Sequence, residues 1–212
     1  GNPVRTSISK GDRQVAIDEY GLAPERKTIL VLGGSQGARS INNAVLDSLE
    51  KNKLNQGYQL LWQTGKRDYK EVREKAAKKV SNCALFPFAR QMDLVYAAAD
   101  IVVARAGALS LAEITACGLP AILIPYPHAA GDHQKKNAED YVVRGMARMI
   151  DEKELEDVDL VGEAVSLLES DEYEKMRSAI ARENEGTRPA VDIIAQDIVD
   201  QIQAMETVGE RV

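Results

Sequence analysis

TILVLGG at residues 28–34 is the stretch that decides the fold. It is a short, nearly continuous apolar run stopped by two glycines, which is typical of a strand buried on both faces of a parallel sheet. Helix-like patterns separate it from further runs of this kind, and this alternation predicts right-handed βαβ units. The further runs lie at residues 58–63, 84–86, 100–104, 121–124 and 149–150. We therefore expect an α/β fold with a doubly wound, Rossmann-like parallel sheet.

The composition is that of an ordinary globular protein. Of the 212 residues 44% are hydrophobic and 28% are charged, which is enough apolar material for a substantial core. The net charge of −6 argues against nucleic acid as a partner, because non-specific binding to nucleic acid needs a basic face. Cys83 and Cys117 lie far apart and form no C-x-x-C pair, so we expect neither a zinc site nor a disulfide framework, and the cytoplasm fits best. No apolar run approaches the roughly 18 residues of a membrane span, and no signal peptide is recognisable.

Beyond residue 150 the pattern becomes helical and acidic. We expect a C-terminal helix over residues 190–206 with an apolar stripe at helical spacing. The stripe consists of Val191, Ile194, Ile198, Ile202 and Met205. It either packs on the chain's own sheet or docks on something outside this chain. No linker or internal repeat is recognisable, so residues 1–212 are expected to form one domain.

GGSQGA at residues 33–38 is the strongest local feature, because it follows the first strand and opens a helix. Ligands of doubly wound sheets lie at the carboxyl ends of the strands. Glycines let the backbone approach a ligand closely, and a helix start offers unpaired N–H groups to a phosphate. The spacing matches neither the dinucleotide fingerprint nor the P-loop. The alternative is a tight turn in which Ser35 only caps the helix.

RAGALSLAE at residues 105–113 is a second loop of this kind, after the fourth strand. Ser110 and Glu113 have the spacing of a capping box, in which each side chain bonds a backbone amide. Alternatively, Glu113 accepts hydrogen bonds from two neighbouring hydroxyls of a ligand. Two such helix starts in one sheet would hold a diphosphate without a metal ion, and no carboxylate cluster resembles a magnesium site.

PYPHAAGDHQ at residues 125–134 follows the fifth strand and lies at the same edge of the predicted sheet. His128 or His133 could act as a catalytic base, although a loop histidine without such a role is more common. Gln134 could hydrogen-bond sugar hydroxyls with both ends of its amide.

Several motifs follow one another in the order of a known family. They are GNPVR at 1–5, GGSQGAR at 33–39, QTGK at 63–66, RAGALSLAE at 105–113, GLPAILIPYPH at 118–128 and DHQ-x-x-NA at 132–138. Together they resemble the MurG family of N-acetylglucosaminyltransferases, which have the GT-B architecture of two Rossmann-like domains. The resemblance implies that this chain is the C-terminal domain, which binds UDP-N-acetylglucosamine (UDP-GlcNAc). The N-terminal domain, which holds the lipid acceptor and is expected to supply the general base, would be absent, and no catalytic residue is assigned here.

The resemblance also implies which residues bind the donor. Ser35 and the helix start at residues 108–110 would hold the diphosphate and the sugar. The backbone of Ala89 would hydrogen-bond the edge of the uracil. Glu113 would bind the ribose hydroxyls, and Gln134, with His133, the sugar hydroxyls. Residues 87–92 depart from the usual form of that segment, so only a backbone contact is carried over there. The full set is Arg5, Ser35, Ala89, Ala108, Leu109, Ser110, Leu111, Ala112, Glu113 and Gln134.

The reaction implied by the resemblance is an inverting transfer of N-acetylglucosamine to undecaprenyl-diphospho-muramoylpentapeptide, the step from lipid I to lipid II in peptidoglycan synthesis. It needs no cofactor and no metal. The full-length protein would be peripheral on the cytoplasmic face of the plasma membrane, and this chain alone is expected to be inactive. Two alternatives are another GT-B enzyme, such as a UDP-GlcNAc 2-epimerase, and a non-catalytic UDP-sugar-binding subunit. A nicotinamide oxidoreductase is disfavoured by the glycine spacing.

Overall fold

A six-stranded, fully parallel sheet forms the centre of the molecule, with strand order β3-β2-β1-β4-β5-β6. The computed structural model describes residues 4–34, 37–51, 54, 57–185, 195–196 and 198–199. The strands are β1 (Lys27–Leu32), β2 (Tyr58–Gln63), β3 (Cys83–Phe86), β4 (Ile101–Ala104), β5 (Ala121–Leu123) and β6 (Ala147–Met149). The order reverses direction at β1 and β4, so the predicted doubly wound α/β fold is confirmed.

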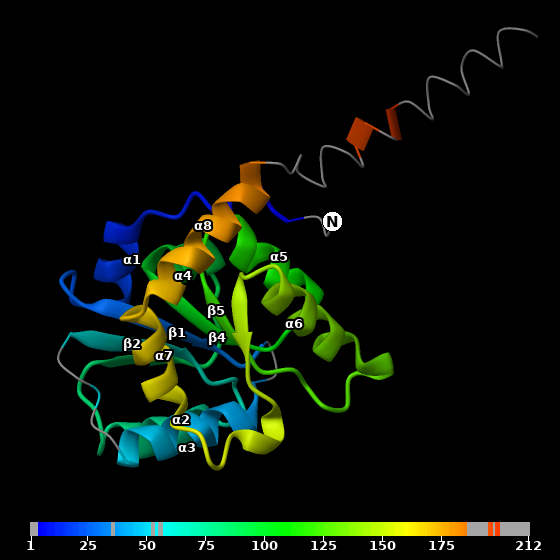
Figure 1. Ribbon diagram of the computed structural model, residues 1–212. Coiled ribbons are helices and arrows are strands. Elements are labelled where there is room, and N and C mark those ends of the chain that lie inside the picture. The colour runs from blue at the N-terminus through cyan, green and yellow to red at the C-terminus, as the bar shows by residue number, and fades with distance from the viewer. Residues whose placement is uncertain are drawn as a thin grey trace, which may run out of the picture.

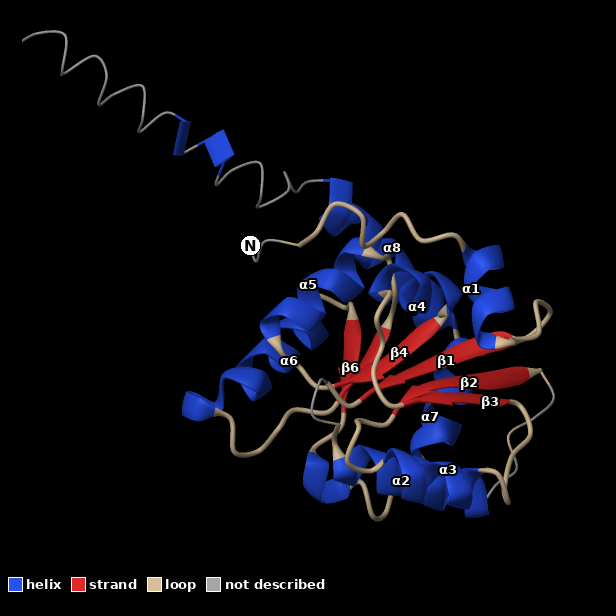
Figure 2. Cartoon of the chain, turned by 180° about the vertical axis from the view of Figure 1, so that it is seen from behind, coloured by secondary structure: helices blue, strands red, loops and turns tan. Residues whose placement is uncertain are grey.

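Helices cover both faces of the sheet (Figures 1 and 2). One layer contains α2 (Arg39–Lys51), α3 (Tyr69–Ala76) and α7 (Leu160–Leu168). The other contains α1 (Arg13–Tyr20), α4 (Met92–Ala98), α5 (Ala108–Ala116) and α6 (His133–Val143). The remaining helices are the 3-10 turns η1 (Ala130–Asp132) and η2 (Glu152–Glu154) and the long α8 (Asp171–Glu185). None of the helices in the described ranges is long and apolar enough to cross a bilayer.

Alternation along β1 explains why the sheet is buried on both faces. Leu30 and Leu32 pack into the core on the side of α1, α4 and α5, while Ile29 and Val31 pack on the side of α2 and α7. All four side chains are at most 6% exposed. Burial of each such side chain contributes about 2 kcal/mol, so the apolar run predicted from the sequence stabilises both layers at once.

Helix α8 connects the two layers across the amino ends of the strands (Figure 1). Near its start, the Tyr173 hydroxyl donates to the carbonyl of Asp100 at 3.0 Å, just before β4. Near its end, the Asn184 side chain donates to the carbonyl of Thr115 in α5 at 2.8 Å. Most of the predicted 190–206 helix lies outside the described residues. In the described part, Ile198 and Val199 are 53% and 45% exposed, so these two positions do not pack on the sheet.

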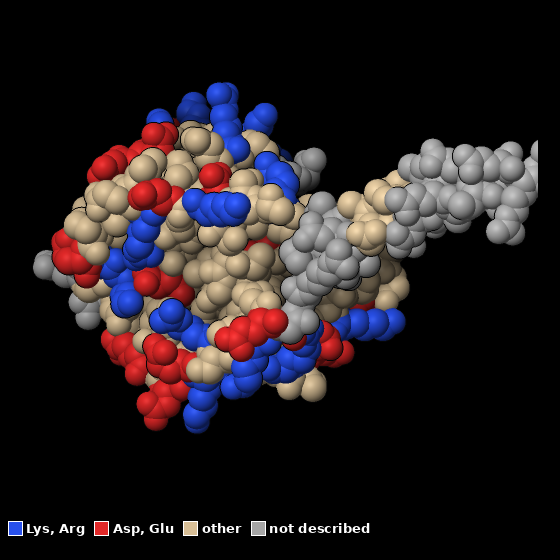
Figure 3. Space-filling model, turned by 90° about the horizontal axis from the view of Figure 1, so that it is seen from above, with Lys and Arg blue, Asp and Glu red and all other residues tan. Residues whose placement is uncertain are grey.

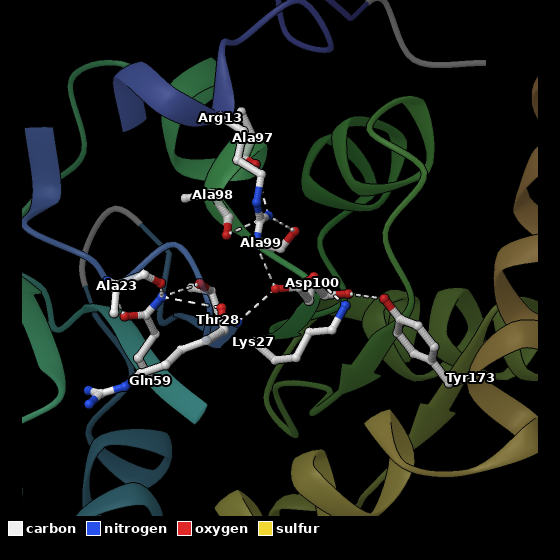
Figure 4. Close-up of polar contacts among 11 residues, drawn as sticks. Arg13, Ala23, Lys27, Thr28, Gln59, Ala97, Ala98, Ala99, Asp100 and Tyr173 are labelled. Atoms are coloured by element: carbon white, nitrogen blue, oxygen red, sulfur yellow. Dashed lines mark hydrogen bonds and ion pairs between the residues drawn. The ribbon is translucent and has the colours of Figure 1, made fainter. Parts of the chain in front are cut away.

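Asp100 organises a polar cluster at the amino ends of the strands (Figure 4). Its Oδ2 accepts from the guanidinium of Arg13 at 3.0 Å and from the backbone N–H of Thr28 at 2.7 Å, and Lys27 lies 3.3 Å from Oδ1. Arg13 also donates to the carbonyls of residues 97–99 at the end of α4. The cluster satisfies polar groups at the end of the sheet opposite the ligand edge.

Charges on the face drawn in Figure 3 are interspersed, with basic and acidic side chains side by side. On this face no broad basic surface of the kind that binds nucleic acid is formed by the described residues, in keeping with the net charge of −6.

Candidate functional site

Two adjoining cavities lie at the carboxyl ends of the strands, where the sequence predicted a ligand. The larger, of about 1420 Å³, is lined by the loops after β1, β4 and β5 and by the start of α2. The smaller, of about 160 Å³, lies beside the loop after β3. Gly34, Arg105 and Ser110 line both cavities, so the two form one continuous site. A hollow at this place in a doubly wound sheet is where a small-molecule ligand is expected to bind.

The loop after β1 requires glycine for steric reasons. Gly34 and Gly37 have φ angles of +78° and +79°, which L side chains rarely adopt. A Cβ on Gly37 would lie 2.5 Å from the carbonyl oxygen of Thr64, and one on Gly33 would lie 2.5 Å from the N of Ala38. The backbone is therefore packed tightly and faces the larger cavity without side chains. Ser35 lies outside the described residues, so its contact with a diphosphate stays a prediction.

The second loop does not form a capping box. Helix α5 begins at Ala108 with Gly107 as its N-cap, and no side chain caps it. Glu113 is half-buried, and its Oε2 accepts a hydrogen bond from the hydroxyl of Tyr96 at 3.1 Å. Burial and then the nearby Glu113 carboxylate raise the pKa of Tyr96 above its ordinary value, so this hydroxyl remains a donor. The capping-box interpretation is wrong, and Glu113 faces the smaller cavity.

Only the first three amides of α5 remain available to a ligand. The N–H groups of Ala108, Leu109 and Ser110 have no partner within the helix, because the first turn of an α-helix leaves them free. Leu111 differs, because its N–H donates to the carbonyl of Gly107 at 2.9 Å and its side chain is 2% exposed. The N–H of Ala112 is used within the helix in the same way. Leu111 and Ala112 thus have no free amide for a donor molecule.

Ala89 and Gln63 are among the residues that line the smaller cavity. The N–H of Ala89 donates to Oε1 of Gln63 at 2.9 Å, and Nε2 of Gln63 donates to the carbonyl of Gly34 at 2.8 Å. The carbonyl of Ala89 is therefore the backbone group of this residue that is left to hydrogen-bond a nucleobase. Gln63 was not among the expected site residues, although a polar glutamine at the end of the buried strand YQLLWQ is a signal, because a buried amide needs hydrogen-bond partners.

The third segment brings Gln134, but neither histidine, to the cavities. Gln134 lines the larger cavity, and its Oε1 accepts from the N–H of Tyr126 at 3.0 Å, which leaves its Nε2 to donate. His133 is exposed and its Nδ1 lies 2.7 Å from the carbonyl oxygen of Ala130. His128 is also exposed and packs edge-on against Tyr126. Neither ring lines either of these two cavities.

Arg105 is a charged residue of the site whose importance only the structure reveals. Its guanidinium donates to the carbonyls of Ile124 and Pro125 at 3.1 and 3.2 Å and to the hydroxyl of Ser40 at 3.0 Å. It also forms an ion pair with Glu152, and its side chain is only 14% exposed. These contacts fix the guanidinium where the two cavities meet, and the Glu152 carboxylate offsets part of its positive charge.

Arg5 does not reach the site in this structure. It is exposed and lines neither cavity, so its contact with the donor stays a prediction. Within the described residues, no group of three or more His, Cys, Asp or Glu side chains is placed to hold a metal ion.

Comparisons with known proteins identify the family and the fold of this chain. The model of the glycosyltransferase family 28 C-terminal domain matches residues 28–195. The chain is 40% identical over 200 residues to a UDP-N-acetylglucosamine–N-acetylmuramyl-(pentapeptide) pyrophosphoryl-undecaprenol N-acetylglucosamine transferase of Chlorobium luteolum, covering 94% of this chain and 53% of the relative. It is 39% identical over 210 residues to the protein of that name in Moorella thermoacetica, covering 96% and 56%.

Solved structures agree with these relatives. The crystal structure of MurG from Acinetobacter baumannii superimposes with a TM-score of 0.70 at 25% identity, covering 95% of this chain and 55% of that one. Os79 of O. sativa, solved with UDP, shares the fold with a TM-score of 0.61 at 17% identity. This chain spans about half the length of the curated relatives it matches. Because the family model covers most of it, the chain belongs to the glycosyltransferase family 28 C-terminal domain family.

Proposed function

We propose that this chain is the donor-binding domain of an inverting N-acetylglucosaminyltransferase that uses UDP-GlcNAc. The observation that carries the proposal is the pair of joined cavities, in which a glycine loop, a helix start and Glu113 meet at one edge of the sheet. The acceptor of the full-length protein is undecaprenyl-diphospho-muramoylpentapeptide, as the names of the relatives indicate. Those names also favour a transferase over an epimerase.

Each part of the donor has a matching part of the site. The diphosphate lies between the loop after β1, including Ser35, and the free amides of Ala108, Leu109 and Ser110, near Arg105. The uracil enters the smaller cavity, where the carbonyl of Ala89 accepts from its N3–H. Glu113 accepts from the ribose hydroxyls, and the Nε2 of Gln134 donates to the sugar. The proposed contacts of Leu111 and Ala112 with the donor do not use their amides, which are bonded within the helix.

The chemistry is a direct displacement at the anomeric carbon. An acceptor hydroxyl attacks this carbon from the face opposite UDP and gives its proton to the general base, while the bond to the diphosphate oxygen breaks and its electron pair leaves with UDP. Negative charge grows on the diphosphate as the bond breaks. The free amides of α5 and the guanidinium of Arg105 are fixed before the reaction, so they stabilise this charge without reorganisation.

The acceptor site and the general base are proposed to come from residues outside this chain. Neither His128 nor His133 lines the cavities, and a base must come within hydrogen-bond reach of the acceptor hydroxyl. Residues 1–212 are then one donor-binding domain, and the full-length protein acts as a peripheral protein on the cytoplasmic face of the plasma membrane.

Parallel calorimetric titrations with UDP, UDP-GlcNAc and NAD test the proposal. We expect the two uridine nucleotides to bind with and without EDTA, and NAD not to bind. Binding of NAD, or loss of UDP affinity in EDTA, would contradict the assignment of the site. A transfer assay with labelled UDP-GlcNAc and the lipid acceptor should give no product with this chain alone. Product formation by the isolated chain would contradict the proposal that the acceptor site and the general base come from residues outside this chain.

A further inference from the structure

Gln63 connects two loops of the site from a buried position. Its side chain is at the carboxyl end of β2, and the residue is only 5% exposed. Its Nε2 donates to the carbonyl of Gly34 in the loop after β1, and its Oε1 accepts from the N–H of Ala89 in the loop after β3. Both ends of the amide are therefore used, each by a different loop.

The strand order explains why this position is special. Strand β2 lies between β1 and β3. A side chain at its carboxyl end can therefore reach the loops that follow both neighbours. The two loops serve neighbouring parts of the proposed donor: Gly34 lies where the two cavities meet, in the diphosphate part, and Ala89 lines the smaller cavity for the uracil. Among the described residues no direct hydrogen bond joins the two loops, so Gln63 bridges them.

We propose that Gln63 is a positioning residue that sets the spacing between the base part and the diphosphate part of the donor site. This inference rests on the proposed function. At neutral pH the amide of a glutamine offers both a donor and an acceptor without a charge, whereas a glutamate of the same shape does so only when it is protonated. By taking the N–H of Ala89, Gln63 also leaves that residue with only its carbonyl for the base, which suits the N3–H of uracil.

Gln59 provides a matched control on the same strand. It is 3% exposed, and its amide also bonds a backbone N–H and a carbonyl, those of Ala23 at 2.8 and 2.9 Å, as well as the Thr28 hydroxyl at 3.0 Å. It lies at the opposite end of β2, next to the Asp100 cluster and away from both cavities (Figure 4). Replacement of either glutamine removes similar buried hydrogen bonds, but only Gln63 contacts the site.

The first experiment compares Gln63→Ala and Gln59→Ala by thermal unfolding and by calorimetric titration with UDP below the unfolding temperature. We expect both variants to unfold at lower temperatures, because both lose buried hydrogen bonds. Only Gln63→Ala should lose UDP affinity, by roughly 10- to 100-fold. Equal UDP affinity of Gln63→Ala and the unchanged protein would overturn the inference, and so would an equal loss in both variants. Failure of the unchanged protein to bind UDP would instead overturn the proposed function.

Gln63→Glu keeps the test available if the alanine variant does not fold. A protonated glutamic acid still donates to the carbonyl of Gly34 and accepts from the N–H of Ala89. The carboxylate instead places one of its oxygens against the carbonyl oxygen of Gly34, so that two acceptors face each other. Burial favours the protonated form. The titratable or charged groups that line the same cavity are Arg105, Glu113 and Tyr96, and the unchanged protein at each pH controls for them.

We expect Gln63→Glu to bind UDP nearly as well as the unchanged protein at about pH 5 and roughly tenfold less tightly at about pH 8. The readout is the UDP affinity of Gln63→Glu divided by that of the unchanged protein at the same pH. A purely structural role would change the stability of the variant with pH but not the affinity of its folded form. A ratio that does not change with pH would overturn the role of the Gly34 contact.

Discussion

Glu113→Gln separates a ligand-binding role from a structural one. Glu113 is half-buried, and its Oε2 accepts from Tyr96. The amide oxygen of a glutamine can still accept from that hydroxyl, and there is no capping box to lose. We therefore expect the free energy of unfolding to change by less than about 1 kcal/mol. The ribose hydroxyls would lose a charged acceptor, which costs roughly 1–3 kcal/mol, or about 5- to 150-fold in UDP affinity.

The assay is calorimetric titration with UDP and with its 2′,3′-dideoxy analogue. If Glu113 binds the ribose, the variant and the unchanged protein should bind the dideoxy analogue with similar affinity, because the partner hydroxyls are gone. Glu74→Gln, at an exposed position of α3 outside both cavities, is the control for a lost surface charge. An unchanged UDP affinity, or an equal loss for both nucleotides, would refute the assignment of the ribose to Glu113.

Two further predictions concern stability. Gly37→Ala should lower the free energy of unfolding, measured by urea titration, by about 2 kcal/mol or more. The reason is that φ is +79° and that the new Cβ would lie 2.5 Å from the carbonyl oxygen of Thr64. A loss below about 0.5 kcal/mol would contradict the steric argument. A hydrogen bond from Arg67, helped by a weaker effect of the one from Arg39, holds the pKa of Asp68 below its ordinary value. Burial of the carboxyl acts in the opposite direction. Asp68 therefore stabilises the fold above about pH 4 and loses this contribution as the pH falls through its folded pKa. The stability difference between the unchanged protein and Asp68→Asn should shrink from about pH 7 to about pH 3, and a constant difference would argue against it.

Local patterns predicted most of the strands. The run at 28–34 corresponds to β1 (Lys27–Leu32), and the run at 58–63 coincides with β2 (Tyr58–Gln63). The last strand was less well predicted, because β6 (Ala147–Met149) begins earlier than the expected 149–150 and is short. Helix α1 was not predicted; its Asp12 N-cap accepts from the N–H groups of Gln14 and Val15, and only Ala16 and Ile17 are buried in it. Short apolar runs stopped by glycine are strong signals, whereas a helix with two buried side chains has little hydrophobic periodicity.

The two loops at the helix starts were also predicted from local sequence, but their side-chain partners were not. Ser110 and Glu113 have the spacing of a capping box, yet α5 begins at Ala108 and Glu113 instead meets Tyr96. Leu111 and Ala112 belong to the matching motif, and only the course of the helix reveals that their amides are used within it. Spacing along the chain cannot decide which residue becomes the N-cap when several small residues precede a helix.

By itself, then, the sequence determined the parallel α/β sheet, the edge at which the two helix-start loops meet and the glycines of the first loop. These depend on local hydrophobic periodicity and on backbone angles that only glycine adopts easily. The tertiary structure decided which polar side chains meet at that edge. Gln63 reaches Gly34 and Ala89 because β2 lies between β1 and β3, and Arg105 meets Ser40 because β4 lies beside β1. Such contacts join residues that are distant along the chain, so they exist only once the strand order has brought the loops together.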